Sequence, residues 1–139
     1  MNTNMVNQLC KDVSKYVKAN TDYEVTIVQK SLKQSNKFPL ISITEEDNSN
    51  VIVSTDFRDK TDLINISVNI YAQDMVLGNT TISNVNIVKE LMSLVDDVLS
   101  RKYRLMRTSC RPTPNLDNTI YRITARYTKK ILSNKNLLI

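Results

Sequence analysis

Within the segment Asp62–Tyr71, apolar and polar residues alternate without a break from Ile64 to Ile70. Isoleucine or valine occupies positions 64, 66, 68 and 70, and Asn65, Ser67 and Asn69 lie between them. Because successive side chains of a strand point to opposite faces of its sheet, this pattern predicts a long strand with one apolar and one polar face. The apolar face of such a strand has to be covered by another layer of the protein.

Two further kinds of pattern complete the expected architecture. In the segments Met5–Val17 and Thr81–Ser100, apolar residues recur at three- and four-residue steps, which predicts amphipathic helices. We therefore expect an α+β fold in which an antiparallel or mixed β-sheet carries two main helices packed on one face. The other strands are predicted at Tyr23–Ile27, Leu40–Glu45, Val51–Thr55, Tyr103–Cys110 and Thr119–Ile131, with loops at Phe57–Thr61 and Gln73–Asn79.

The length of the chain and its few glycines bound the number of domains. Its 139 residues fit one domain, since typical domains contain roughly 100–200 residues. One glycine and three prolines favour long strands and helices over a fold rich in loops. We expect a single domain over residues 1–139, in which residues 133–139, ending in Leu137-Leu138-Ile139, form a tail that stays mobile or covers a neighbouring subunit.

The residue types that are missing exclude several kinds of active site. The chain has no histidine, which removes the commonest general base and the commonest metal ligand. A P-loop or a dinucleotide-binding turn needs several glycines, and this chain has only Gly78. Two cysteines, Cys10 and Cys110, are too few for a structural zinc site, and we expect both to be reduced and buried. These absences predict a protein that is not an enzyme and binds neither a cofactor nor a metal.

Carboxylates occur in two clusters, Glu45-Glu46-Asp47 and Asp96-Asp97. A two-carboxylate glycosidase or a magnesium site uses such pairs. The first cluster, however, falls in a predicted turn and the second on the polar side of a predicted helix. We interpret both clusters as solvated surface.

Cations follow one face of the last predicted strand. Arg122, Arg126 and Lys130 are spaced four residues apart, which places neighbouring members ~13 Å apart along a strand. This row, named the cationic row below, fits three roles: a solvated sheet face, a contact with carboxylates of a protein partner, or a contact with phosphates of DNA. The aromatic residues typical of single-strand binders are missing from its face. A second basic stretch follows the second predicted helix. We interpret it as cations that interact favourably with the negative end of the helix dipole at the C-terminus. It contains Arg101, Lys102, Arg104, Arg107 and Arg111.

The interpretation of the cationic row as a protein contact names specific partners. Three like charges in a row gain little on an isolated sheet face, whereas a neighbouring subunit can supply opposite charges. We expect Arg122, Arg126 and Lys130 to meet carboxylates of the next copy. The candidate carboxylates are Glu45, Glu46, Asp96 and Asp97.

The beginning of the chain has no basic segment followed by an apolar one, which predicts no secretory signal. No apolar run approaches the ~20 residues of a membrane-spanning helix, so we expect no membrane partner. The net charge of +5 permits contact with an acidic protein or with nucleic acid and requires neither.

Several phrases of the sequence resemble the tail terminator (tail completion) proteins of long-tailed phages and phage-tail-like particles. The resemblance covers roughly residues 3–132 and includes the order of the predicted elements. The matching phrases are Phe38-Pro39-Leu40-Ile41-Ser42-Ile43, the alternating strand from Ile64 to Ala72, Pro112-Thr113-Pro114-Asn115, and Ile120-Tyr121-Arg122-Ile123-Thr124-Ala125-Arg126-Tyr127.

The resemblance implies a structural virion protein without catalytic residues. Subunits of this family form a six-fold ring on the last ring of the tail tube, end tail growth and present a surface to the head or neck. The implied partners are further copies of the chain, the tail tube protein, and sheath, neck or connector proteins. The implied location is the head-proximal end of the phage tail, after assembly in the host bacterial cytoplasm. Two alternatives stay open: another neck or head-completion (head–tail connector) protein, and a basic nucleic-acid-binding module.

Overall fold

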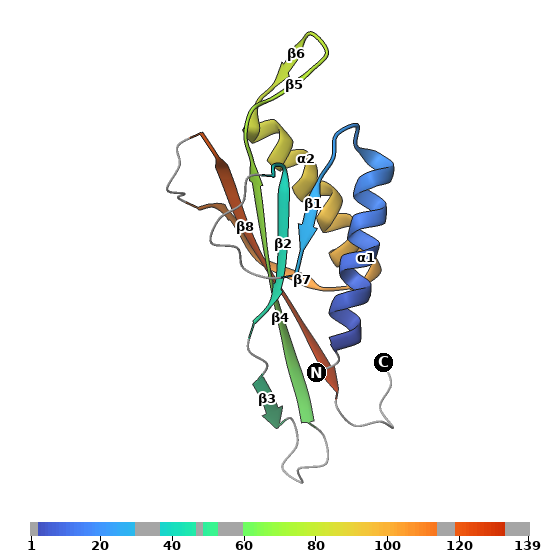
Figure 1. Cartoon of the computed structure of the whole chain (residues 1–139). Helices are drawn as coiled ribbons and strands as arrows, with labels where there is room; N and C mark the ends of the chain where they lie inside the picture. Colours follow the sequence, from blue (N-terminus) through green and yellow to red (C-terminus); the bar gives the residue numbers. More distant parts are fainter. Residues whose placement is uncertain (1–2, 30–36, 47–48, 53–59, 114–118, 133–139) are drawn as a thin grey trace.

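The main sheet is built around β4 (Lys60–Ala72), which contains the alternating segment of the sequence. The computed structural model describes residues 3–29, 37–46, 49–52, 60–113 and 119–132. The sheet has the order β1-β2-β4-β8-β7, and β3 pairs with the first residues of β4 outside this path (Figure 1). Only the β1–β2 pair is parallel. The remaining strands are β1 (Thr26–Val28), β2 (Leu40–Glu45), β3 (Ser49–Ile52), β7 (Met106–Pro112) and β8 (Tyr121–Leu132).

Two helices cover one face of this sheet (Figure 1). Helix α1 (Thr3–Asn20) lies beside α2 (Asn84–Asp96), and the π-helix η1 (Asp97–Lys102) continues α2. Ser83 caps α2, because its side chain accepts a hydrogen bond from the backbone N–H of Asn86. The α+β class, the mixed sheet and the packing of the helices on one face are therefore confirmed.

The region before α2 differs from the prediction. A loop was predicted over Gln73–Asn79, but β5 (Met75–Leu77) and β6 (Thr80–Ile82) form a hairpin at one end of the molecule (Figure 1). Its two-residue turn is possible because Gly78 adopts a φ of +60°, a conformation that glycine reaches without a steric penalty. The helix predicted from Thr81 consequently begins only after this hairpin, at Asn84.

Several strand boundaries also differ. Strand β4 begins at Lys60, inside the loop predicted at Phe57–Thr61, and β3 begins at Ser49 rather than Val51. The strand predicted from Tyr103 begins at Met106, because the π-helix extends through Lys102 and the chain then turns at Arg104, whose φ is +58°. The third-strand residues 53–55 and the predicted tail, residues 133–139, lie outside the described residues.

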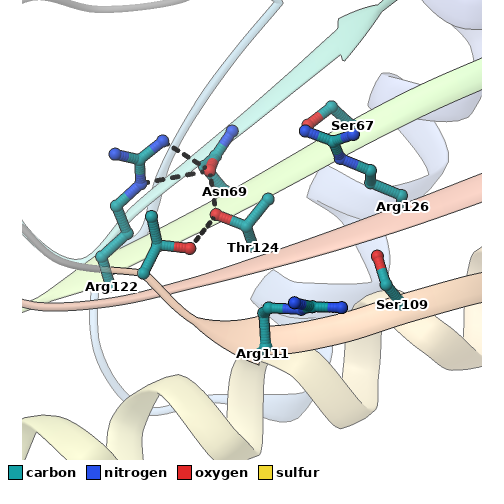
Figure 2. Close-up of a pocket in the computed structure, with 8 residues that line it drawn as sticks. Ser67, Asn69, Ser109, Arg111, Arg122, Thr124 and Arg126 are labelled. Carbon is teal, nitrogen blue, oxygen red and sulfur yellow. Dashed lines mark hydrogen bonds between the residues drawn. The ribbon is translucent and has the colours of Figure 1, made fainter.

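Neither of the two described helices packs on the second face of the sheet, which is polar along its centre (Figure 2). The odd-numbered residues Ser67 and Asn69 of β4 point to this face, together with the even-numbered residues of β8 that pair with them. This arrangement follows directly from the alternation in the sequence, since the period of a strand is two residues. We call this face the uncovered face.

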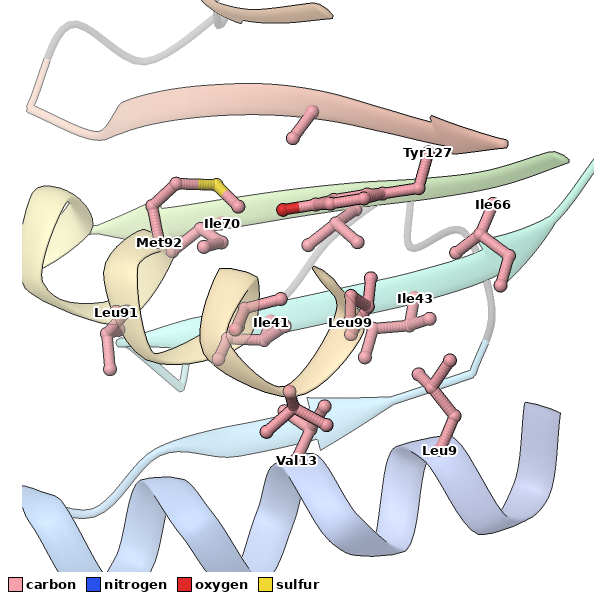
Figure 3. Close-up of a cluster of buried hydrophobic side chains, with 14 of the residues drawn as sticks. Leu9, Val13, Ile41, Ile43, Ile66, Ile70, Leu91, Met92, Leu99 and Tyr127 are labelled. Atoms are coloured by element: carbon pink, nitrogen blue, oxygen red, sulfur yellow. The ribbon is translucent and has the colours of Figure 1, made fainter. Parts of the chain in front are cut away.

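The hydrophobic core lies between the covered face of the sheet and the two helices (Figure 3). Even-numbered residues of β4 point into it, and Ile66 and Ile70 are at most 1% exposed. The helices contribute Leu9 and Val13 from α1 and Leu91 and Leu99 from α2 and η1, all of which are fully buried. Within the described residues, no helix is both long and apolar enough to cross a membrane.

Tyrosine–carboxylate hydrogen bonds join the elements around this core. The hydroxyl of Tyr127 on β8 donates to Asp96 of α2 at 2.7 Å, and the hydroxyl of Tyr103 donates to Asp12 of α1 at 2.5 Å. Lys102 lies 2.9 Å from the same Asp12 carboxylate. Lys102 is the last residue of the π-helix, and Tyr103 follows it directly. The end of the π-helix therefore places both side chains beside Asp12 of α1.

The contacts of Asp12 predict a contribution to acid sensitivity. Hydrogen bonds from Tyr103 and Lys102 hold the pKa of Asp12 below its usual range, and its side chain is only 12% exposed. A carboxylate with a lowered pKa stabilises the folded state fully above its unfolded pKa of about 3.9, and this stabilisation is lost as the pH falls through the folded pKa. We therefore expect the Asp12→Asn variant to lose less stability than the wild type between pH 7 and pH 3.

Urea unfolding of both proteins at several pH values measures this difference. The wild-type curve is expected to approach the curve of the Asp12→Asn variant as the solution becomes acidic. Equal losses in both proteins over the same pH interval would show that Asp12 does not contribute through its lowered pKa.

Candidate functional site

The uncovered face contains a hollow of about 400 Å³ over β4, β8 and β7 (Figure 2). Three arginines contribute to its lining, and the remaining lining residues are short and polar. We call it the cationic hollow. Its lining consists of Ser67, Asn69, Ser109, Arg111, Thr113, Arg122, Thr124 and Arg126.

The strand register explains why a hollow forms on a sheet face. Thr124 on β8 pairs with Asn69 on one side and with Arg111 on the other. Arg126 pairs in the same way with Ser67 and Ser109. Short side chains therefore form the floor, and the longer arginines stand around it. Because the side chains of the floor are shorter than those at the margin, the face is hollowed rather than flat.

Hydrogen bonds fix one of the three arginines. The Nε and the Nη2 of Arg122 donate to Oδ1 of Asn69 at 3.2 and 2.9 Å, and Thr124 Oγ1 donates to the same oxygen at 2.6 Å. Thr113 Oγ1 in turn donates to Thr124 Oγ1 at 2.6 Å. The guanidinium of Arg122 also lies 5.2 Å from the ring centroid of Tyr71, a cation–π contact. Arg122 is therefore oriented before any ligand arrives.

The other two arginines have no such partners. Arg111 and Arg126 are exposed, and neither side chain forms a hydrogen bond or an ion pair with the described part of the chain. Among the described residues that line the hollow, none is a carboxylate. The hollow thus combines uncompensated positive charge with hydroxyl and amide groups, an arrangement suited to binding anionic oxygen atoms.

The structure brings together only part of the predicted interface. Arg122, Arg126 and Lys130 share the uncovered face, since they occupy the same parity of β8, but Lys130 does not line the hollow. Glu45 and Glu46 are exposed at the end of β2. Glu45 pairs with Ile66, and Ile66 points to the covered face. Within one subunit, Glu45 therefore lies on the opposite side of the sheet from the cationic row.

The interpretation of Asp96 and Asp97 as solvated surface holds only in part, because their side chains are 34% and 31% exposed. Both are half-buried, and each accepts a hydrogen bond from a tyrosine hydroxyl, Tyr127 for Asp96 and Tyr16 for Asp97. The helix face that carries them is polar in sequence, but α1 and β8 lie close enough to supply these donors. The two carboxylates stabilise contacts within the subunit and are poor candidates for pairing with the cationic row of another copy.

Arg111 is the site residue that the sequence interpretation missed. It was assigned to the basic stretch after the second helix, whereas it lies on β7 within the hollow. A register shift between Arg107 and Ser109 decides which residues of β7 face the hollow. The alternation of Ser109, Arg111 and Thr113 was the available signal, and it agrees with the observed orientation.

Neither cysteine belongs to the hollow. Cys10 is buried in the core, where burial raises the pKa of its thiol to about 11, and Cys110 is half-buried on β7. Both thiols are free. Among the residues that the structure describes, no group of three or more His, Cys, Asp or Glu side chains gathers where it could hold a metal ion.

Comparison with known proteins adds no assignment to this geometry. No protein-family model matches the sequence, and no curated protein matches it significantly. The functional interpretation therefore depends on the sequence patterns and on the arrangement of side chains on the uncovered face.

Proposed function

We propose that this protein is a structural subunit that forms a ring, expected to be hexameric, on the end of a phage tail tube. The ring would end tail growth and offer a surface to the head or neck. The observation that carries this proposal is the uncovered sheet face with the exposed cations Arg111 and Arg126, neither of which has an ion-pair partner among the described residues. Such a face is suited to a protein contact, and the resemblance to tail terminator proteins supplies the kind of assembly.

The positions of opposite charges support a head-to-tail contact. The cationic row lies on the uncovered face, whereas Glu45 is placed by its register on the side of the helices. A contact between the row of one copy and Glu45 or Glu46 of the next would join two different surfaces. Contacts of this heterologous kind close into rings when the rotation between subunits permits it.

The hairpin β5–β6 offers a second surface for assembly. It lies at one end of the molecule and forms a sheet of its own (Figure 1), with Met75 and Ile82 at its base packed against the core. Val76 on this hairpin is 67% exposed. An isolated two-stranded hairpin is only marginally stable by itself, so a contact with a neighbouring protein would stabilise it.

Nucleic-acid binding is less well supported by the same face. Tyr71 is an aromatic residue on the uncovered face, and the guanidinium of Arg122 already lies over its ring. Binders of single strands stack bases on accessible aromatic rings, and Tyr71 does not offer one on that side. The cationic charge alone provides the salt-dependent, sequence-independent part of such binding.

Charge reversal tests the role of the cationic row in assembly. The double variant Arg126→Glu/Lys130→Glu is expected to weaken ring formation or capping of tail tubes while leaving the subunit folded. Each exposed pair contributes ~1 kcal/mol or less, but every subunit of a ring repeats the contact. Arg122 stays unchanged, because its contacts with Asn69 and Tyr71 belong to the fold itself.

Sedimentation velocity at low and high salt measures the rings, and circular dichroism verifies folding. Lys89→Glu, an exposed position on α2, serves as a control for a charge change on the helix side. Normal rings of the double variant at both salt concentrations would contradict the proposed contact. Electron microscopy of particles that carry labelled protein tests the function itself. The proposed function predicts that the label lies at the head-proximal end of the tail tube.

A further inference from the structure

The cationic hollow has features that a row of surface cations lacks. Its floor of short side chains lies between arginines on two adjacent strands, and Arg111 stands beside the floor on β7. We propose that the hollow binds an acidic segment of a different protein, with carboxylates placed on the floor between Arg111 and Arg126. This inference rests on the proposed function, because the partner would be a neighbouring protein of the particle.

The contacts around the hollow form an anion site before any partner binds. Asn69 Oδ1 is occupied by donors from Arg122 and Thr124, so it does not repel an incoming carboxylate as a free acceptor would. The two arginines without partners, Arg111 and Arg126, remain available to donate. A carboxylate accepts two parallel N–H bonds from one guanidinium, a stronger arrangement than a single neutral hydrogen bond.

The shape of the hollow favours a protein segment over a nucleic acid. Its floor consists of serine, threonine and asparagine side chains, which offer no surface on which a base can stack. Arg126 and Lys130, at the hollow and further along the same face of β8, are both exposed. A short acidic segment would place one or two carboxylates on the floor and others along the face.

Five carboxylates of this chain are engaged within the subunit. Asp96 and Asp97 accept from tyrosines, and Asp12 accepts from Tyr103. Asp74 accepts from the backbone N–H of Asn84, and Glu90 accepts from Tyr23. Because these five carboxylates stabilise the subunit itself, and Glu45 and Glu46 are the proposed partners of the cationic row in the next copy, a different protein is the better source of an acidic segment for the hollow.

A pair of matched variants separates the hollow from general attraction to a basic face. Arg111 lines the hollow but is not in the cationic row, whereas Lys130 is in the row but does not line the hollow. Both side chains are exposed, and Arg111→Glu and Lys130→Glu change the net charge equally. The probe is a fluorescent peptide of six glutamates, with a six-glutamine peptide as its uncharged control.

Binding is measured by fluorescence anisotropy with the full-length protein at low and high salt. We expect the glutamate peptide to bind the wild type in a salt-dependent manner. Arg111→Glu should weaken this binding at least tenfold, while Lys130→Glu weakens it less than threefold. Arg126→Glu should behave like Arg111→Glu. Circular dichroism confirms that each variant is folded.

Three results would overturn the inference. The first is an equal loss of affinity for the glutamate peptide in Arg111→Glu and Lys130→Glu. The second is that the glutamine peptide binds the wild type as tightly as the glutamate peptide. The third is that a six-nucleotide thymidine strand binds more tightly than the glutamate peptide. Sedimentation of the same samples keeps the two proposals distinguishable. Loss of peptide binding with intact rings in Arg111→Glu supports the hollow as a separate site, whereas failure of the wild type to form rings contradicts only the proposed function.

Discussion

Replacing Ile66 by alanine is expected to lower the free energy of unfolding by about 2–5 kcal/mol. Ile66 lies near the middle of β4, is 1% exposed, and points into the core between the sheet and the helices (Figure 3). The substitution removes buried methyl and methylene groups and leaves a cavity that rigid neighbouring strands close only in part. Strand β4 lies between β2 and β8 in the sheet. Because β4 is hydrogen-bonded to a strand on each side, the backbone around residue 66 can move only a little into the cavity.

Thermal and urea unfolding measure this loss against two companion variants. Val88→Ala removes a fully buried side chain of α2, and because valine is smaller than isoleucine we expect a smaller loss. Val76→Ala is the surface control, since Val76 is 67% exposed on the β5–β6 hairpin, and its effect should stay within about 0.5 kcal/mol. Unchanged melting of both Ile66→Ala and Val88→Ala would show that the covered face was assigned to the wrong residues.

The hydrogen bond between Tyr127 and Asp96 predicts an asymmetry between its two partners. Asp96 Oδ1 accepts from Tyr127 at 2.7 Å and from Ser100 at 3.1 Å, and Arg107 lies 3.7 Å away. The Tyr127 side chain is 1% exposed, and burial together with the neighbouring carboxylate raises the pKa of its hydroxyl. Asp96→Ala therefore leaves a buried hydroxyl without an acceptor and should cost about 1–3 kcal/mol.

Tyr127→Phe should cost less, about 0.5–1.5 kcal/mol, because Asp96 keeps Ser100 and Arg107 as partners. Denaturant unfolding of both single variants and of the double variant completes a double-mutant cycle, and the coupling energy between the two sites should be clearly different from zero. Two outcomes would contradict this account: a larger loss in Tyr127→Phe than in Asp96→Ala, and strict additivity of the two changes.

Patterns in the sequence were sufficient for the main elements. Strand β2 (Leu40–Glu45) has the predicted boundaries, and the alternation in β4 identified the residues that enter the core. The first helix contains the predicted segment Met5–Val17. These predictions succeeded because strand and helix periods differ strongly, and because each element is long enough for its period to be recognised.

Shorter and irregular elements could not be obtained in this way. The strands of the β5–β6 hairpin span three residues each, which is too short for a period to appear. The π-helix of residues 97–102 differs from an α-helix by its hydrogen bonds and not by a residue pattern, and it shifted the start of β7.

That Arg122 and Arg126 face away from the core follows from the sequence alone, because side chains of a strand alternate and Ile123, Ala125 and Tyr127 on the other face are the less polar set. That these arginines surround a hollow depends on the folded sheet. The register of β4 and β8 placed Ser67 and Asn69 beside them, and the register shift in β7 placed Arg111 opposite Thr124. Pairing between strands far apart in sequence depends on the whole sheet, so a local pattern gives the face of a residue but not its neighbours across the sheet.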